Sequence, residues 1–167
     1  MTARDIVLWP DPRLKTVCNP VVQVDAATRV LVSDMLETMY AAPGRGLAAP
    51  QVGALVRIFV MDVDWKEGAR APVVCINPEI ESESDDVATR GEGCLSIPGI
   101  TLEISRPAAV TLSWTDLDGA RRSDVFTGFA AACVQHELDH LNGIVTFDHL
   151  SPQGRADMEA EYAEVTQ

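Results

Sequence analysis

Apolar residues recur at helical spacing between Asp25 and Tyr40, and this pattern predicts the first helix of the chain. The apolar stripe consists of Ala27, Leu31, Met35 and Met39. Residues three and four positions apart lie on the same face of a helix, so this stripe would face the core. The Asp25 side chain can cap the first turn, and the segment Pro43-Gly-Arg-Gly46 ends the helical pattern.

Runs of β-branched residues and of alternating apolar residues predict strands elsewhere. The predicted strands are residues 6–13, 54–63, 73–76, 109–115 and a return strand through Val125 and Phe126. The first is a short apolar strand broken by two prolines. In the fourth, Val110, Leu112 and Trp114 alternate onto one side, and Asp118-Gly119 then predicts a hairpin turn.

A second helix is predicted between Gly128 and the Asn142-Gly143 pair, which can close it with a left-handed cap. One face carries Phe129, Cys133, His136 and His140, and the opposite face carries Ala131, Val134, Leu138 and Leu141. A helix that is apolar on both sides belongs in the interior, so strands are expected to wrap around it. Ser151-Pro152 predicts the N-cap and first residue of a C-terminal helix.

These elements together predict an α+β fold with antiparallel β-sheets around a central helix, flanked by an N-terminal and a C-terminal helix. Residues 1–167 are expected to form a single domain, because a chain of this length can bury one core and is too short for two. No apolar run approaches the roughly 20 residues that a membrane helix requires. The first residues lack the apolar segment of a signal peptide.

Charge and cysteine content narrow the function further. The formal net charge of −12, without any cluster of lysine and arginine, argues against tight binding of nucleic acid. The acidic residues gather in an acidic loop at 81–86 and in the segment 157–164, where they are expected to form solvated surface. Four cysteines without a C-x-x-C pair predict reduced thiols and a cytoplasmic protein. The sequence makes no prediction of oligomeric state.

The segment His136-Glu-Leu-Asp-His140 is the most specific chemical pattern in the chain. On a helix, the two histidines lie one turn apart on the same face, where both imidazoles can bind one metal ion. Glu137 lies beside them and could reach a water molecule at that ion. Such a pattern indicates a metal-dependent hydrolase, although a buried helix can also carry two histidines by chance.

A catalytic site of this kind usually has a third protein ligand, and several residues could supply it. The extended metalloprotease pattern requires a histidine at position 146, which holds Thr146, and His149 lies three residues too far along. A zincin-type endopeptidase would instead use a downstream glutamate; on spacing alone the candidates are Glu159, Glu161 and Glu164. Cys94 is the other candidate, because its thiolate and two imidazoles would form a site suited to zinc or ferrous iron.

Three segments in order resemble the signature motifs of the peptide deformylase family. They are Gly44-Arg-Gly-Leu-Ala-Ala-Pro-Gln51, Glu92-Gly-Cys-Leu-Ser96 and Gln135-His-Glu-Leu-Asp-His-Leu-Asn-Gly143. The resemblance covers about residues 6 to 152. It implies a single catalytic domain that removes the N-formyl group from the initiator methionine of newly made proteins and releases formate. The expected partners are therefore N-formylmethionyl nascent polypeptides.

The resemblance also implies roles for individual residues. Cys94, His136 and His140 would bind the metal, with Fe²⁺ favoured and Zn²⁺, Ni²⁺ or Co²⁺ as alternatives. Glu137 would be the general base and acid, and Gln51 and the Leu95 backbone N–H would stabilise the oxyanion. The implied substrate-binding residues are Gly46, Arg45, Phe129 and Cys133. An ion pair between Glu92 and Arg106 is expected beneath the cysteine loop.

Two positions depart from the usual pattern of the family. Arg45 stands where an aliphatic residue is usual near the substrate channel, and Thr101 where an aromatic residue is frequent. A guanidinium without an acidic partner would disfavour burial of a methionine side chain. Three hypotheses therefore remain: a deformylase, a zincin-type endopeptidase, and a protein of the deformylase fold that binds peptide N-termini with altered or little turnover.

Overall fold

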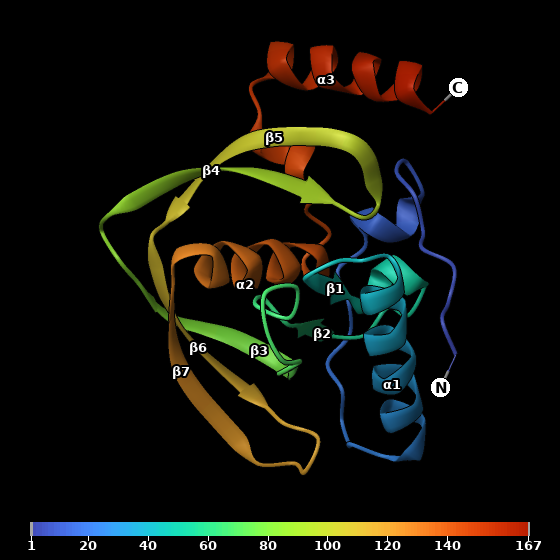
Figure 1. Cartoon of the computed structure of the whole chain (residues 1–167), viewed down its shortest axis with the longest axis vertical. Helices are drawn as coiled ribbons and strands as arrows, with labels where there is room; N and C mark the ends of the chain where they lie inside the picture. The colour runs from blue at the N-terminus through green and yellow to red at the C-terminus, as the bar shows by residue number, and fades with distance from the viewer. Residues whose placement is uncertain (1, 167) are drawn as a thin grey trace.

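The computed structural model describes residues 2–166, and within this range it contains three α-helices and two antiparallel sheets (Figure 1). The helices are α1 (Ala26–Ala41), α2 (Gly128–Leu141) and α3 (Pro152–Val165). The strands are β1 (Gly46–Ala48), β2 (Ile58–Met61), β3 (Val73–Glu83), β4 (Val87–Cys94), β5 (Ile97–Pro107), β6 (Ala109–Thr115) and β7 (Arg121–Thr127). The α+β architecture with antiparallel sheets is thus confirmed.

Strands from distant parts of the chain build the larger sheet, in the order β1-β2-β3-β6-β7. The smaller sheet is the β4–β5 hairpin. Helix α2 lies in the centre of the molecule and contacts strands of both sheets (Figure 1). Val134 and Leu141 on its apolar face are fully buried, as the two-sided apolar pattern predicts.

Helix α2 ends where the chain crosses an earlier segment. Asn142 occupies the C-cap position, and Gly143 follows with a φ of 72°. A side chain at position 143 would place its Cβ 2.7 Å from the backbone oxygen of Lys15, so close approach of the two segments requires glycine as well. This crossing fixes the C-terminal end of the central helix.

Helix α1 begins as predicted, with the Asp25 side chain accepting a hydrogen bond from the Thr28 backbone N–H. The buried face differs from the predicted stripe, because Ala27 is exposed and Leu31 is only half-buried. The buried positions in the second half include polar ones that bind the N-terminal segment. Asp34 forms an ion pair with Arg4, and the Thr38 hydroxyl accepts a hydrogen bond from the Arg4 backbone N–H.

The N-terminal segment is not the predicted strand at residues 6–13. It is irregular and leads into a 3₁₀ helix, η1 (Pro12–Lys15), which is capped by Asp11. Two of its backbone N–H groups bind elsewhere: Val7 donates to the Gln51 carbonyl at 2.8 Å and Trp9 to the Ser96 carbonyl at 2.9 Å. The segment therefore ties two of the sequence motifs together instead of joining a sheet.

Strand lengths also differ from the expectations. The pattern at 54–63 corresponds to the shorter β2, and β3 continues to Glu83, into the segment expected to be an acidic loop. The hairpin β4–β5 was not predicted at all. The β6–β7 hairpin is confirmed, with a turn in which Gly119 has a φ of 83°.

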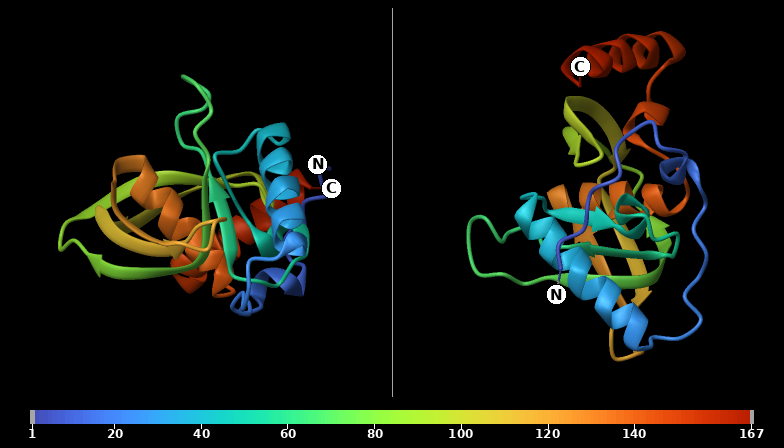
Figure 2. Two further views of the ribbon diagram at one scale, coloured as in Figure 1. Left: turned by 90° about the horizontal axis from the view of Figure 1, so that it is seen from below. Right: turned by 90° about the vertical axis from the view of Figure 1, so that its right-hand side faces the viewer.

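Helix α3 lies at the outer side of the β4–β5 hairpin and packs against β5 (Figure 2). It begins with the predicted cap, since the Ser151 hydroxyl accepts a hydrogen bond from the Gly154 backbone N–H. The Tyr162 hydroxyl donates to the Trp9 carbonyl at 2.9 Å and joins the two ends of the chain. Among residues 2–166, no helix combines the length and the apolar character needed to span a bilayer.

Candidate active site

Three potential metal ligands, Cys94, His136 and His140, converge between the β4–β5 hairpin and helix α2. Their ligand atoms all lie within 4.8 Å of one another, and the Cys94 Sγ is 3.4 Å from the His140 Nε2. Cys94 is the last residue of β4, at the turn of the hairpin. The two histidines lie one turn apart on α2, with ring centroids separated by 5.0 Å. The cluster therefore joins the smaller sheet to the central helix.

The chemistry of these donors fits a divalent metal ion. One sulfur and two imidazole nitrogens suit ions of intermediate softness such as zinc and ferrous iron. Burial lowers the pKa of His140 well below its ordinary value, and the positive charge that His136 can carry acts in the same direction. A neutral imidazole is the form that binds a metal ion. Within residues 2–166, Cys94, His136 and His140 form the one group of this kind.

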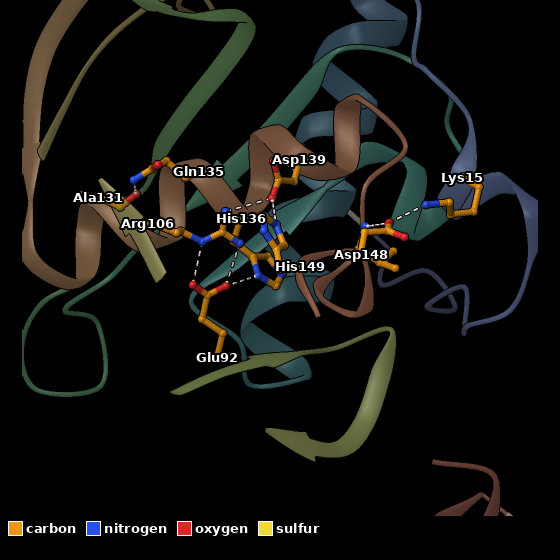
Figure 3. Close-up of polar contacts among 10 residues, drawn as sticks. Lys15, Glu92, Arg106, Ala131, Gln135, His136, Asp139, Asp148 and His149 are labelled. Atoms are coloured by element: carbon orange, nitrogen blue, oxygen red, sulfur yellow. Dashed lines mark hydrogen bonds and ion pairs between the residues drawn. The ribbon is translucent and has the colours of Figure 1, made fainter. Parts of the chain in front are cut away.

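A buried network of charged side chains holds His136 from behind (Figure 3). The Glu92 Oε1 lies 3.0 Å from the His136 Nδ1, which leaves the Nε2 directed at the cluster. Arg106 donates two hydrogen bonds to Glu92, at 2.7 and 2.9 Å, and a third to Asp139 at 2.9 Å. The expected Glu92–Arg106 ion pair is therefore present. Burial raises the pKa of Glu92, but the contacts with His136 and Arg106 outweigh it and bring the value to about 2.

The other candidate ligands lie away from the cluster. His149 is at the outer end of the same network, with its Nε2 2.8 Å from the Asp139 Oδ2 (Figure 3). Glu159, Glu161 and Glu164 lie on α3, outside the hairpin, where Glu159 pairs with Arg155. The geometry gives no support to a site built from His136, His140 and a downstream glutamate.

Glu137 is buried beside the metal-ligand cluster, with 5% of its surface exposed. Its Oε1 and the His140 Nδ1 are the two buried side-chain polar atoms that lack a hydrogen-bond partner in the described chain. Burial raises the pKa of Glu137 to about 7. A Cβ at Gly46 would lie 2.6 Å from the Glu137 Oε2 and 2.9 Å from the Cys133 Sγ, so only glycine leaves room for the carboxylate.

Gln51 reaches the cluster from the 3₁₀ helix η2 (Ala49–Val52), which follows β1. Its Oε1 accepts a hydrogen bond from the Ala48 backbone N–H at 2.9 Å. This contact turns the Nε2 toward the Ser96 Oγ, at 3.0 Å, and the Cys94 Sγ, at 3.6 Å. Leu95 lies in the hairpin turn, and its side chain approaches Gly44, where a Cβ would be 2.7 Å from the Leu95 Cδ1. The structure thus brings Gln51 and Leu95 to the wall of one cavity.

A cavity of about 780 Å³ opens onto the cluster. All the residues expected at a substrate site line it: Arg45, Gly46, Gln51, Leu95, Phe129, Cys133 and Glu137. Thr101, the second departure from the family pattern, also lines it. Burial raises the pKa of the Cys133 thiol well above its ordinary value, and the Cys133 Sγ lies 3.8 Å from the Arg45 carbonyl oxygen. A protonated thiol there suits a lining residue and not a ligand.

Arg45 has an acidic partner that the sequence motifs did not reveal. Its Nη2 lies 2.7 Å from the Glu67 Oε1, and its guanidinium lies 5.6 Å from the centre of the Phe129 ring. The sequence analysis also assigned no contact to Asp139 or Ser96, although both residues lie inside recognised motifs. Glu67 gave no signal, because its contact depends on how the loop between β2 and β3 folds back over the cavity.

Comparison with known proteins agrees with this geometry. The family model of polypeptide deformylases matches residues 3–156. A peptide deformylase of Afipia carboxidovorans is 49% identical over 151 residues, which cover 90% of this chain and 88% of that protein. A peptide deformylase of Agrobacterium fabrum is 47% identical, with 90% and 89% covered.

Solved structures give the same result. The crystal structure of a peptide deformylase from Legionella pneumophila superposes with a TM-score of 0.93 at 36% identity, covering 99% of this chain and 96% of that one. A peptide deformylase from Ehrlichia chaffeensis, solved in complex with actinonin, gives 0.92 at 39% identity, with 98% of each chain covered. The match in sequence, in fold and in the convergence of the three motifs shows that the chain belongs to the polypeptide deformylase family, whose members are metal-dependent hydrolases that remove the N-formyl group from nascent proteins.

Proposed function

We propose that this chain hydrolyses the formamide bond of N-formylmethionyl polypeptides, releasing formate and a free amino terminus. The observation that carries the proposal is the convergence of Cys94, His136 and His140 beside Glu137 at the inner end of one cavity. The substrate is a protein under synthesis, so we assign the reaction to the cytoplasm and to residues 1–167 as one catalytic unit.

Cys94, His136 and His140 would hold the metal ion, for which we propose Fe²⁺, with Zn²⁺, Ni²⁺ or Co²⁺ as alternatives. Such an ion supplies Lewis acidity and makes a water molecule more acidic. The support from this chain is the donor set, the burial that lowers the pKa of His140, and the Glu92 contact that orients His136.

Glu137 would move the proton. Its buried Oε1 would accept a proton from the attacking water and then deliver it to the departing amine nitrogen as the C–N bond breaks. The pKa of about 7 suits both roles, because a group is an efficient base and acid when its pKa lies near the working pH. Gly46 supports this assignment, since it leaves the carboxylate free of steric contact.

Gln51 and Leu95 would stabilise the negative charge that develops on the formyl oxygen. The Gln51 Nε2 is held in position by the contact of its Oε1 with Ala48, and Leu95 lies in the hairpin turn that lines the same cavity. A donor placed in advance in this way typically contributes about 3 kcal/mol to the transition state.

The peptide would lie along the free edge of β1, which is the outermost strand of its sheet. The Arg45 carbonyl accepts a hydrogen bond from the Asp62 backbone N–H, so the backbone groups of the next residue, Gly46, point away from β2. An extended peptide can pair with such groups as an added strand. Arg45, Phe129 and Cys133 would then contact the substrate side chains from the cavity wall.

Formate release tests this function. Protein prepared without oxygen should release formate from formyl-Met-Ala-Ser, whereas its Glu137→Ala variant should not, because Glu137 moves the proton. Casein labelled with fluorescein should remain intact, and the Cys94→Ser variant should lose both metal and activity. If the unaltered protein releases no more formate than Glu137→Ala, the hydrolytic proposal is wrong and a peptide-binding role replaces it.

A further inference from the structure

The mouth of the cavity carries the opposite charge to the rest of the molecule. The chain has 25 acidic and 13 basic residues, yet the solvent-accessible charges that line the cavity belong to Arg45 and Lys66. The acidic lining residues, Glu92 and Glu137, are 8% and 5% exposed, and Glu92 is already paired with Arg106. A ligand entering the cavity therefore meets a positive rim on an acidic protein.

Arg45 is held across this rim by contacts from two elements. Its Nη2 pairs with Glu67 and its Nη1 donates to the Val63 carbonyl, both in the loop between β2 and β3. The guanidinium also lies over the Phe129 ring at the start of α2. Trp65 fastens the same loop to the cavity wall, since its Nε1 donates to the Gly44 carbonyl at 2.9 Å. Lys66, the next residue in this loop, lies 5.8 Å from the centre of the Trp65 ring and lines the same cavity as Arg45.

The carboxylate that neutralises Arg45 is exchangeable. The side chain of Glu67 is 63% exposed and that of Arg45 is 29% exposed. An ion pair with such an exposed partner contributes little, because water screens it and two side chains must be held in place. A carboxylate carried by a bound peptide can take the place of Glu67 on the planar guanidinium without loss of hydrogen bonds.

We propose that Arg45, aided by Lys66, makes this chain selective for formylmethionyl peptides with an acidic residue at one of the two positions after methionine. Arg45 directly precedes Gly46 on the edge strand, so a peptide extended along that edge carries these positions past the rim. Glu67 then acts as a competitor for Arg45 from within the chain. This inference rests on the deformylase function proposed above.

A matched peptide series tests the selectivity. The ratio of kcat/KM for formyl-Met-Glu-Ala-Ser and formyl-Met-Gln-Ala-Ser, and for the pair with Glu or Gln at the third position, should favour Glu by about threefold to tenfold at one of the two positions. Salt at 0.5 M, on the order of a threefold excess over physiological ionic strength, should reduce this ratio. The net charge of −12 alone predicts the reverse, a disadvantage for the acidic peptide.

Variants assign the selectivity to Arg45. Arg45→Met should bring the Glu/Gln ratio to about one, Lys66→Gln should reduce it in part, and Glu67→Gln should raise it by freeing the guanidinium. Arg122→Gln is the matched control, because Arg122, an exposed residue of β7, pairs with Asp116 of the preceding turn and does not line the cavity. The control should leave the ratio unchanged. The opposite shifts of Arg45→Met and Glu67→Gln cannot both arise from loss of folding.

Measuring peptide affinity tests the selectivity independently of the hydrolytic reaction. The Glu137→Ala variant should bind both formyl peptides without cleaving them, and titration calorimetry should give the same threefold to tenfold preference for Glu, on the order of one ion pair. Equal affinities for the Glu and Gln peptides, or an unchanged ratio in Arg45→Met, would overturn the assignment of Arg45. Formate release with no preference would overturn the selectivity alone, whereas preferential binding without any formate would overturn only the hydrolytic function.

Discussion

Gly46 is the glycine whose missing side chain leaves room for the proposed catalytic carboxylate. Its hydrogen faces the Glu137 carboxylate and the Cys133 thiol, where a Cβ would meet them at 2.6 and 2.9 Å. The carboxylate is the flexible partner, so it would move. In this way a single methyl group would displace the carboxylate proposed to move the proton.

We therefore predict that Gly46→Ala lowers kcat/KM for formyl-Met-Ala-Ser by about 10²-fold, as a displacement of about 1 Å in a catalytic group can do. The measurement is the initial rate of formate release, with the melting temperature recorded in parallel. Gly68→Ala is the control, because a Cβ there meets nothing closer than the Asp64 oxygen at 3.9 Å. Equal losses in both variants would show that the effect of Gly46→Ala comes from the backbone and not from Glu137.

At the scale of elements, the pattern of apolar residues predicted helices better than strands. Helix α2 was predicted because both of its faces are apolar, and α1 because Asp25 caps a regular apolar pattern. Strand β4 carries no such pattern, since most of its side chains are exposed and two are glycines. In β5, Ile100, Leu102 and Ile104 do alternate toward the core, a signal that the prediction did not use.

The residues of the candidate site likewise differ in how far the sequence predicts them. His136, His140 and Glu137 were predictable, because the spacing on one helix places two histidines and a carboxylate together. Cys94 was one of several candidates for the third ligand, and the family resemblance implied its role. The supporting contacts depend on elements that meet only in the folded chain. Glu67 reaches Arg45 through a folded loop, and Asp139 links His149 to Arg106 across the β5–α2 contact. Local patterns carry no information on such contacts.

Arg106 holds β5 and α2 together, because its guanidinium lies between the Glu92 and Asp139 carboxylates (Figure 3). Its side chain is 7% exposed, so removing it would leave the buried Glu92 carboxylate with His136 as its remaining side-chain partner and without a compensating guanidinium charge. We predict that Arg106→Met lowers the free energy of unfolding by about 3–5 kcal/mol. Urea unfolding at neutral pH measures this loss. The double variant Arg106→Met/Glu92→Gln should recover part of it, and a double variant no more stable than the single one would contradict the electrostatic explanation.

Asp148 links three elements at the other end of the molecule, η1, the 3₁₀ helix η3 (Thr146–His149) and α3. It pairs with Lys15 and Arg155 and accepts a hydrogen bond from the Val145 backbone N–H. Partial burial raises the pKa of Asp148, but these contacts outweigh it and hold the pKa below its ordinary value. A carboxylate with a lowered pKa in the folded state stabilises the fold above its unfolded pKa, and this contribution is lost as the pH falls through the folded value.

We accordingly predict that Asp148→Asn is less stable than the unaltered chain at pH 7, and that the difference narrows as the pH falls below about 4. Urea unfolding at a series of pH values gives the measurement. Asp157→Asn, on the neighbouring helix α3, is the control, because Asp157 accepts a hydrogen bond from the uncharged Gln153. A difference that did not narrow at all as the pH fell would show that Asp148 acts through packing and not through its charge.

At the scale of the whole molecule, the metal-ligand cluster joins the smaller sheet to the central helix. Cys94 comes from the hairpin that forms the smaller sheet, whereas His136 and His140 come from the helix that packs on the larger sheet. Glu92 and Arg106, from the same hairpin, support this junction from behind. A metal ion bound by all three ligands would therefore cross-link the hairpin to the central helix.

Binding of metal should for this reason stabilise the entire chain and not only the site. An ion present at 100 times its dissociation constant stabilises the folded state by about 2.7 kcal/mol, which corresponds to about 5–10 °C in melting temperature for a chain of this size. We predict that a chelator lowers the melting temperature by this amount and that added Fe²⁺, kept free of oxygen, or Zn²⁺ restores it.

The Cys94→Ser variant should lose most of this metal-dependent increase in melting temperature, because the hairpin then lacks its ligand. Cys75→Ser serves as the control: Cys75 is fully buried in β3, so the variant should melt lower but keep the metal increment. An equal increment in Cys94→Ser would mean that the ion binds the helix alone and does not cross-link the fold.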